Sequence, residues 1–117
     1  MKNLRFEDLE ARLAEFAAAR DWDPFHSPKN LAMALAAEAG ELLEQFQWLT
    51  EEQSTRLTDE RRAAVALELA DIQLYLVRLA ARLDIDLVST AHHKIDLNGE
   101  KYPVEKSRGH ARKYTEL

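Results

Sequence analysis

Residues 58–83 read TDERRAAVALELADIQLYLVRLAARL, and this stretch decides the fold class. Thr58 is the predicted N-cap, because its hydroxyl can accept from free N–H groups of the first helical turn and two acids follow it. Beyond the cap, apolar residues recur at intervals of three and four, the repeat of an α-helix. They make two faces, one with Val65, Leu69, Ile72, Leu76, Leu79 and Leu83, the other with Leu67, Ala70, Leu74 and Val77. A helix that is apolar on two sides is typical of a bundle centre or a subunit interface.

Three further helices are predicted around this one, because the same periodicity recurs and only three glycines and three prolines interrupt it. We place them at about residues 4–20, 27–49 and 84–100, separated by an aromatic connector at 21–26 and a polar loop at 50–57. The second begins at Ser27-Pro28, a hydroxyl cap followed by proline. We therefore expect an all-α, four-helix-bundle-like fold. A single domain spans residues 1–117, with a core at about 4–102 and a tail at 103–117 that lacks periodicity.

The composition excludes several classes of protein. The chain has 117 residues, and 16 Lys+Arg against 21 Asp+Glu give a net charge of −5, which argues against a nucleic-acid partner. No cysteine is present, which excludes disulfides, zinc–thiolate sites and thiol nucleophiles. No apolar run approaches the ~20 residues of a membrane span, and the charged stretch Met1–Arg5 does not resemble a signal region. We expect a cytoplasmic protein with no membrane partner.

Acidic residues interrupt the apolar pattern of two of the predicted helices. Glu38 falls inside the stripe of the second helix, where a leucine is expected, and Glu41 lies beside it one turn on. The helix at 58–83 carries Glu68 and Asp71 on the strip between its two apolar faces. Residues three apart lie on neighbouring turns of one helical face. Antiparallel packing of the two helices would therefore bring all four carboxylates to one place.

Four carboxylates at one buried place need a counter-charge, because like charges raise each other's pKa. Oxygen ligands favour a hard divalent cation, Mg²⁺ or Mn²⁺, and Mg²⁺ commonly takes substrate phosphates as further ligands. A di-iron bundle would need Glu-x-x-His pairs, and the residues three before His92 and His93 are Ser89 and Thr90. A second interpretation remains open. In it the acids serve salt bridges, with Arg78 and Arg82 as candidate partners.

Glu38-x-x-Glu41 followed by Glu68-x-x-Asp71 resembles the signature of the all-α NTP pyrophosphohydrolases of the MazG-like superfamily. The flanking segments resemble the dCTP pyrophosphatase branch. They are RDWDPFHSPKNL at 20–31, GELLEQFQW at 40–48, ELADIQLYL at 68–76, KIDLN at 94–98 and YPV at 102–104. The similarity covers roughly residues 16–108.

The resemblance implies hydrolysis of a nucleoside triphosphate to the monophosphate and diphosphate, with Mg²⁺ as the cofactor and Mn²⁺ as a possible substitute. It implies metal ligands at Glu38, Glu41, Glu68 and Asp71. It also implies a base and sugar site at Trp22, His26, Trp48 and Tyr75, with Lys94, Asn98 and Tyr102 near the phosphates or sugar. Glu41 is the candidate to orient or deprotonate the attacking water. Family members are dimers or tetramers with sites between subunits, so a homo-oligomer is expected.

The expected substrate is dCTP or a modified dCTP, because the flanking segments resemble the dCTP branch, and the expected role is to clear unwanted nucleotides. The alternative from another class is a non-catalytic, oligomeric helical module that binds a nucleotide or another protein. The two interpretations differ in how the stability of the protein responds to Mg²⁺. A metal site becomes more stable when Mg²⁺ is added, whereas a salt-bridged bundle has no reason to gain stability from the metal.

Overall fold

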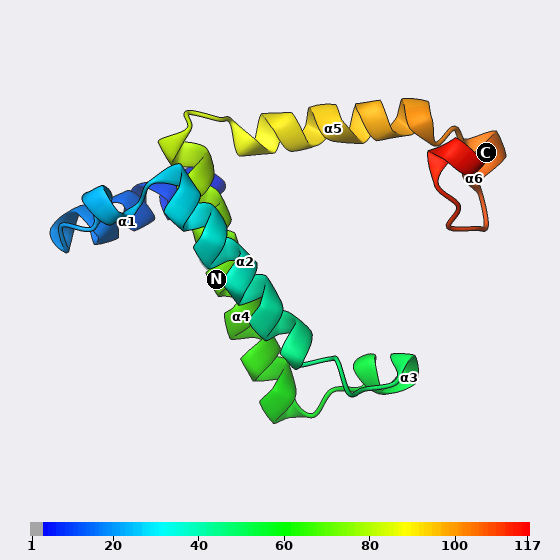
Figure 1. Cartoon of the computed structure of the whole chain (residues 1–117), viewed down its shortest axis with the longest axis horizontal. Coiled ribbons are helices and arrows are strands. Elements are labelled where there is room, and N and C mark those ends of the chain that lie inside the picture. The colour runs from blue at the N-terminus through cyan, green and yellow to red at the C-terminus, as the bar shows by residue number, and fades with distance from the viewer. Residues whose placement is uncertain (1–3) are drawn as a thin grey trace. The chain divides into compact units, whose positions relative to one another are not determined.

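The computed structural model describes residues 4–117, and within them every regular element is helical (Figure 1). The elements are α1 (Phe6–Ala19), a 3₁₀ turn (Asp23–Phe25), α2 (Pro28–Glu44), α3 (Glu51–Ser54), α4 (Asp59–Arg82), α5 (Leu87–Lys101), α6 (Val104–Ser107) and a second 3₁₀ turn (Tyr114–Glu116). The all-α prediction is confirmed. The chain forms two compact units, one ending at Asp84 and one covering residues 85–117.

The helices α2 and α4 begin at the predicted capping residues. The Ser27 hydroxyl accepts from the backbone N–H of Asn30 at 3.2 Å, and the Thr58 hydroxyl accepts from the N–H of Arg61 at 3.2 Å. Asp86, at the start of the helix predicted at about 84–100, accepts from the N–H of Ser89 at 3.0 Å. Each cap satisfies a donor that has no partner within the helix, and so fixes where the helix starts.

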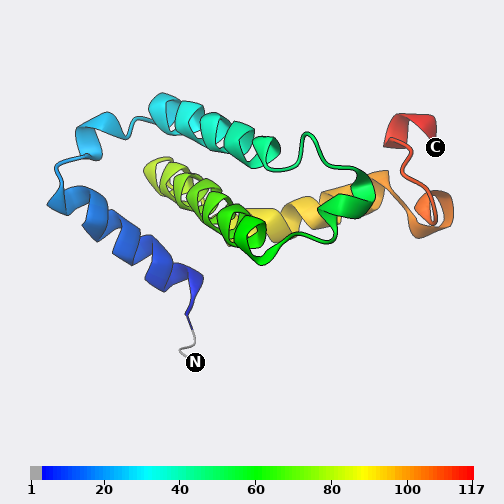
Figure 2. The same ribbon diagram turned by 90° about the horizontal axis from the view of Figure 1, so that it is seen from below.

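In the first unit, α2 and α4 form an antiparallel hairpin (Figures 1 and 2). Hydrogen bonds between the two segments occur at both ends. Near the start of α4, Arg61 Nη1 donates to the Gln45 carbonyl at the end of α2, at 2.5 Å. At the end of α4, Arg82 Nε donates to the His26 carbonyl just before α2, at 3.2 Å. The helix α1 packs against α4. The facing sides of α2 and α4 are therefore held in a fixed register.

The buried apolar core is small. Its members are Ala17, Leu31, Val65, Val77 and Ala80. Large apolar side chains on both helices of the hairpin remain exposed, among them Met33, Leu43, Leu67 and Leu69. In both helices, apolar surface thus extends beyond the face that the hairpin buries. None of the helices in residues 4–117 combines the length and the apolar character needed to cross a membrane.

Two local predictions were wrong. The second helix ends at Glu44 and not near Leu49, because Phe46 and Leu49 donate to carbonyls three residues back and the chain tightens into turns. The predicted loop at 50–57 contains α3, which the Thr50 hydroxyl and the Gln53 side chain cap reciprocally at 3.1 and 3.0 Å. This capping box stabilises a single turn that carries no apolar periodicity.

The second unit consists of α5, α6 and the final 3₁₀ turn, so the predicted tail is partly helical. The rings of Tyr102 and Tyr114 meet edge to face with centroids 6.0 Å apart, and the Lys101 ammonium lies 4.9 Å from the Tyr114 ring. These contacts tie the C-terminal residues to the end of α5. Periodicity could not predict them, because they depend on single aromatic side chains.

Candidate active site

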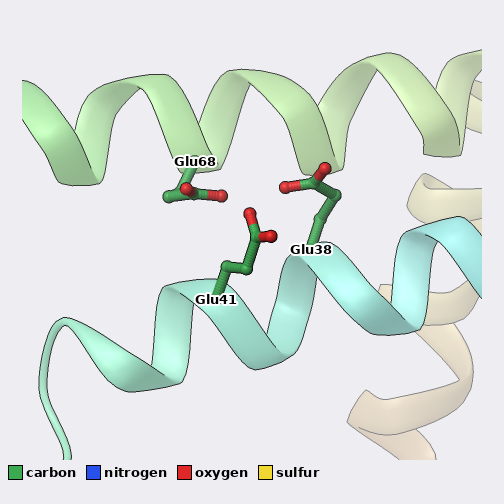
Figure 3. Close-up of side chains that lie close together, drawn as sticks. All are labelled: Glu38, Glu41 and Glu68. Carbon is green, nitrogen blue, oxygen red and sulfur yellow. The ribbon is translucent and has the colours of Figure 1, made fainter.

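Three of the four predicted carboxylates meet between α2 and α4. Glu38 and Glu41 come from neighbouring turns of α2, and Glu68 comes from the facing side of α4. Each contributes one oxygen to a group whose members all lie within 4.8 Å of one another. Figure 3 shows the three carboxylates pointing toward one another in the space between the helices. We call Glu38, Glu41 and Glu68 the carboxylate triplet.

The triplet carries negative charge that the protein leaves uncompensated. The Oε2 atoms of Glu38 and Glu68 are both buried and have no hydrogen-bond partner. The pKa of Glu38 is raised to about 7, first by a hydrogen bond that its protonated carboxyl can share with Glu68. Loss of solvent and the nearby carboxylates of Glu41 and Asp71 raise it further. Buried carboxylate oxygens without a partner are costly, so the triplet is suited to a cation.

Asp71, the fourth predicted ligand, lies one turn beyond Glu68 on α4 and outside the triplet. Its charge nonetheless contributes to the raised pKa of Glu38, and its side chain is exposed. It also lines the pocket next to the triplet. Asp71 is therefore within electrostatic reach of the triplet and faces the space where a ligand would approach.

The interpretation that Arg78 and Arg82 neutralise these acids is wrong. Arg78 forms an ion pair with Asp23, and Arg82 donates to the His26 carbonyl. Within residues 4–117, no lysine, arginine or histidine forms an ion pair with a member of the triplet. In the free protein the proton that Glu38 shares with Glu68 relieves part of the repulsion, and a fully ionised triplet needs a cation that these side chains do not supply.

A hard divalent cation fits these residues. Every candidate ligand is a carboxylate oxygen, and two of those oxygens are buried without a partner. Mg²⁺ is held in proteins by one or more carboxylates together with water and substrate phosphates. Glu38 and Glu68 would supply the buried ligands, Glu41 an exposed one, and Asp71 a further one on the pocket side.

A pocket of about 260 Å³ lies next to the triplet, between α1, the connector before α2, and α4. It is lined by Leu13, Phe16, Trp22, His26, Asp71, Leu74, Tyr75 and Arg78. Three predicted base or sugar contacts, Trp22, His26 and Tyr75, are therefore brought together. Trp22 meets Phe16 edge to face with ring centroids 5.6 Å apart, and its ring lies 6.1 Å from that of His26. The pocket thus presents aromatic walls that suit a planar ligand.

From the sequence, Arg78 is predicted only as a candidate partner of the acids, which misses its place in the pocket. It is only 8% exposed, and its Nη2 donates to Asp23 Oδ1 at 2.5 Å while its Nε donates to His26 Nδ1 at 3.2 Å. The signal for this place was its spacing: Arg78 lies one turn past Tyr75, on the polar strip of α4 that also carries Glu68 and Asp71. Its partners lie 52 and 55 residues away, which no local pattern encodes.

The other predicted substrate contacts lie elsewhere in the chain. Trp48 follows the end of α2 and is 87% exposed, whereas Trp22 precedes the start of that helix. Lys94 and Asn98 lie on α5, and Tyr102 is its C-cap. All three belong to the second unit, and their role near the phosphates stays a prediction.

The fold and the site define an all-α protein with acid-x-x-acid pairs on two antiparallel helices and an aromatic pocket beside them. The profile of the MazG-like family matches residues 33–117. The chain belongs to this family, as the acid motifs and their flanks predicted.

Curated relatives and a solved structure agree with this assignment. The chain is 50% identical to dCTP pyrophosphatase 1 of Mus musculus and 47% identical to that of Homo sapiens, each over 113 residues. The alignments include 95% of this chain and 66% of each relative, so the chain spans about two thirds of their length. The crystal structure of a pyrophosphatase from Archaeoglobus fulgidus superposes with a TM-score of 0.81 at 34% identity, covering 88% of this chain and 96% of that one.

Proposed function

We propose that this protein is a Mg²⁺-dependent nucleoside triphosphate pyrophosphohydrolase that converts dCTP, or a modified dCTP, to the monophosphate and diphosphate. In this role it removes unwanted nucleotides from the cytoplasmic pool. The observation that carries the proposal is the carboxylate triplet, Glu38, Glu41 and Glu68, which has buried, unpaired oxygens and no cationic partner. The similarity to dCTP pyrophosphatase 1 over 95% of the chain supports the reaction and the substrate class.

The arrangement of pocket and triplet suits a nucleotide. Asp71 lines the pocket and acts electrostatically on Glu38, so the two parts of the site adjoin. A base held against Trp22 and His26 would leave the sugar near Tyr75 and direct the phosphates toward the acids. An acidic site that binds a polyanion requires bound cations, since phosphate oxygens and carboxylates otherwise repel one another.

The residues divide the chemistry between binding and proton transfer. Bound Mg²⁺ would neutralise charge that develops on the phosphate oxygens and lower the pKa of water. Glu38 and Glu68 are half-buried and would bind the metal from the space between α2 and α4. Glu41 is the exposed member of the triplet, so its carboxylate can reach a water from solvent and orient or deprotonate it.

The positions of the two tryptophans support a homo-oligomer. The helix α2 has 17 residues, so at about 1.5 Å per residue its ends lie roughly 25 Å apart. Trp22 and Trp48 flank opposite ends and cannot contact one base within a single chain. If both contact the nucleotide, Trp48 comes from a second copy, in a dimer or a tetramer. Lys94, Asn98 and Tyr102 would then approach the phosphates or sugar in the assembled site.

Diphosphate release from a panel of canonical and modified dNTPs and NTPs tests the proposal. We expect release from dCTP that requires Mg²⁺ or Mn²⁺ and stops with EDTA, with the monophosphate as the other product. Glu38→Gln and Glu68→Gln should lower kcat/KM by at least about a hundredfold, since each removes a charged ligand. Glu44→Gln is the matched control, because Glu44 is exposed on the same helix and outside the triplet.

The same experiment separates the enzyme from the non-catalytic helical module. A folded protein that releases no diphosphate from any nucleotide, and whose thermal midpoint does not respond to Mg²⁺, would contradict the proposed function. A midpoint that rises with Mg²⁺ in the wild type but not in Glu38→Gln would support the metal site independently of turnover.

A further inference from the structure

The ring of His26 is held by an arginine that reaches it from another element. Arg78 Nε, on α4, donates to Nδ1 of the ring at 3.2 Å. The same guanidinium is anchored by Asp23 three residues before His26, and Arg82 Nε binds the His26 carbonyl at 3.2 Å. Both the ring and the backbone of His26 are therefore fixed to the last turns of α4.

The identity of the donor determines the tautomer of His26. An arginine guanidinium remains protonated in proteins and can only donate, so Nδ1 must use its lone pair as the acceptor. The one proton of a neutral imidazole is then on Nε2. Burial of the ring is the first cause that lowers the pKa of His26. The positive charges of Arg78 and Arg82 lower this pKa further, while the negative charge of Asp23 raises it. The net lowering favours the neutral ring.

The Nε2 atom is left as a free donor. Within residues 4–117, no group forms a hydrogen bond with it, and the His26 side chain lines the pocket beside Trp22. A half-buried N–H without a partner is available to a ligand that offers an acceptor.

We propose that Arg78 is a positioning residue that holds His26 as the Nε2–H tautomer, and that this N–H donates to N3 of a cytosine base. The proposal rests on the proposed function for its ligand, while the tautomer rests on the contacts of Arg78 alone. Cytosine carries lone pairs at both O2 and N3, whereas thymine and uracil carry an N–H at N3. A fixed donor at N3 therefore favours cytosine, because a site built around one hydrogen bond rejects analogues that lack the partner. A donor at O2 would not discriminate, since all three bases carry that acceptor.

The tautomer is measured on the free protein, without nucleotide or metal. Ring ¹⁵N chemical shifts of His26 distinguish a protonated nitrogen from an unprotonated one. We expect protonated Nε2 and unprotonated Nδ1 in the wild type at pH 7.5, and a mixture of tautomers in Arg78→Met. Arg62→Met is the matched control, because it removes the same charge from an exposed position of α4. A wild-type ring with its proton on Nδ1, or an unchanged ring in Arg78→Met, would overturn the proposal.

Steady-state kinetics tests the consequence for the base. In Arg78→Met we expect KM for dCTP to rise about tenfold with kcat within about twofold, because the lost contact is made equally in the ground and transition states. The preference for dCTP over dUTP should fall by a similar factor. Equal loss for both nucleotides would indicate general damage to the pocket and would contradict base reading by His26.

Substitution of His26 itself gives a rescue experiment. A glutamine places its amide nitrogen near the position of Nε2, while the shorter asparagine corresponds to Nδ1. We expect His26→Gln to keep KM for dCTP within about threefold of the wild type and His26→Asn to raise it about tenfold. Equal losses in the two variants would overturn the assigned donor. Absence of turnover in the wild type would instead contradict the proposed function and leave the tautomer result intact.

Discussion

At the scale of single residues, the site contains buried charges treated in two opposite ways. Arg78 is 8% exposed, and Asp23 and His26 both accept from its guanidinium. Glu38 and Glu68 each have a buried oxygen with no partner. A paired buried charge can hold structure in place, whereas an unpaired one destabilises the protein until a ligand compensates it. The arginine therefore shapes the pocket, and the acids are suited to bind a cation.

The lowered pKa of His26 predicts a pH dependence of stability. The unfolded chain, with the usual histidine pKa near 6.5, binds a proton more readily than the folded protein does. Neutral His26 therefore makes its full contribution to the free energy of unfolding above about pH 7, and this contribution is lost as the pH falls through 6.5 toward the lowered pKa. Because Gln does not titrate, the stability gap between the wild type and His26→Gln should shrink from pH 7.5 to pH 5 in urea unfolding. A constant gap would contradict this prediction.

Asp84 predicts a stabilising substitution. It follows the C-terminal cap of α4 with φ of 54°, in the left-handed region, and places a negative charge at the negative end of the helix dipole. Asparagine tolerates that conformation and carries no charge. We expect Asp84→Asn to raise the free energy of unfolding by about 0.5 kcal/mol at low ionic strength, measured by urea denaturation. A decrease would show that the Asp84 carboxylate makes a favourable interaction.

At the scale of elements, the register of α2 against α4 decides which acids meet. Periodicity alone placed Glu38, Glu41 and Glu68 on facing sides, because positions three apart share a helical face and both pairs interrupt an apolar pattern. It could not place Asp71 outside the triplet, since that depends on the exact offset between the two helices. That offset is set by tertiary contacts such as the hydrogen bond from Arg61 to Gln45.

Sequence reasoning recovered the helices better than their ends. The caps Ser27 and Thr58 are local signals, and the structure confirms both. The early end of α2 and the single turn of α3 depend on backbone turns and on one reciprocal pair, Thr50 and Gln53. Such features compete closely with continued helix or with loop, so a periodicity argument cannot resolve them.

The link between Arg61 and the end of α2 predicts a loss of stability on truncation. Arg61→Ala removes a charged donor from the Gln45 carbonyl, a group near a helix end with few alternative partners. We expect the free energy of unfolding to fall by about 1 kcal/mol because the bond is partly exposed to solvent. Arg62→Ala is the control, since its exposed side chain makes no hydrogen bond within residues 4–117. Equal changes in both variants would assign the effect to charge and not to this bond.

At the scale of the whole molecule, the amount of exposed apolar surface is large for a chain with so small a core. Leu67 is 70% exposed, Leu43 is 63% exposed and Met33 is 60% exposed, all on the helices that carry the site. Large exposed apolar side chains are common at interfaces, so these residues support the proposed oligomer. The two apolar faces of α4 predicted such an interface, but periodicity cannot identify the copy or the number of copies that cover it.

The exposed face of α4 therefore predicts a stability that depends on protein concentration. If a second copy covers Leu67, association and folding are linked, and the thermal midpoint should rise as the concentration is increased. Leu67→Glu would place a charge in that interface. We expect it to shift the protein to a smaller species in analytical ultracentrifugation and to lower the midpoint by several degrees. Glu52→Gln on α3, which is exposed and outside the hairpin, is the control. A monomeric wild type whose midpoint is independent of concentration would contradict the oligomer and the proposed contact between the nucleotide and Trp48 of a second copy.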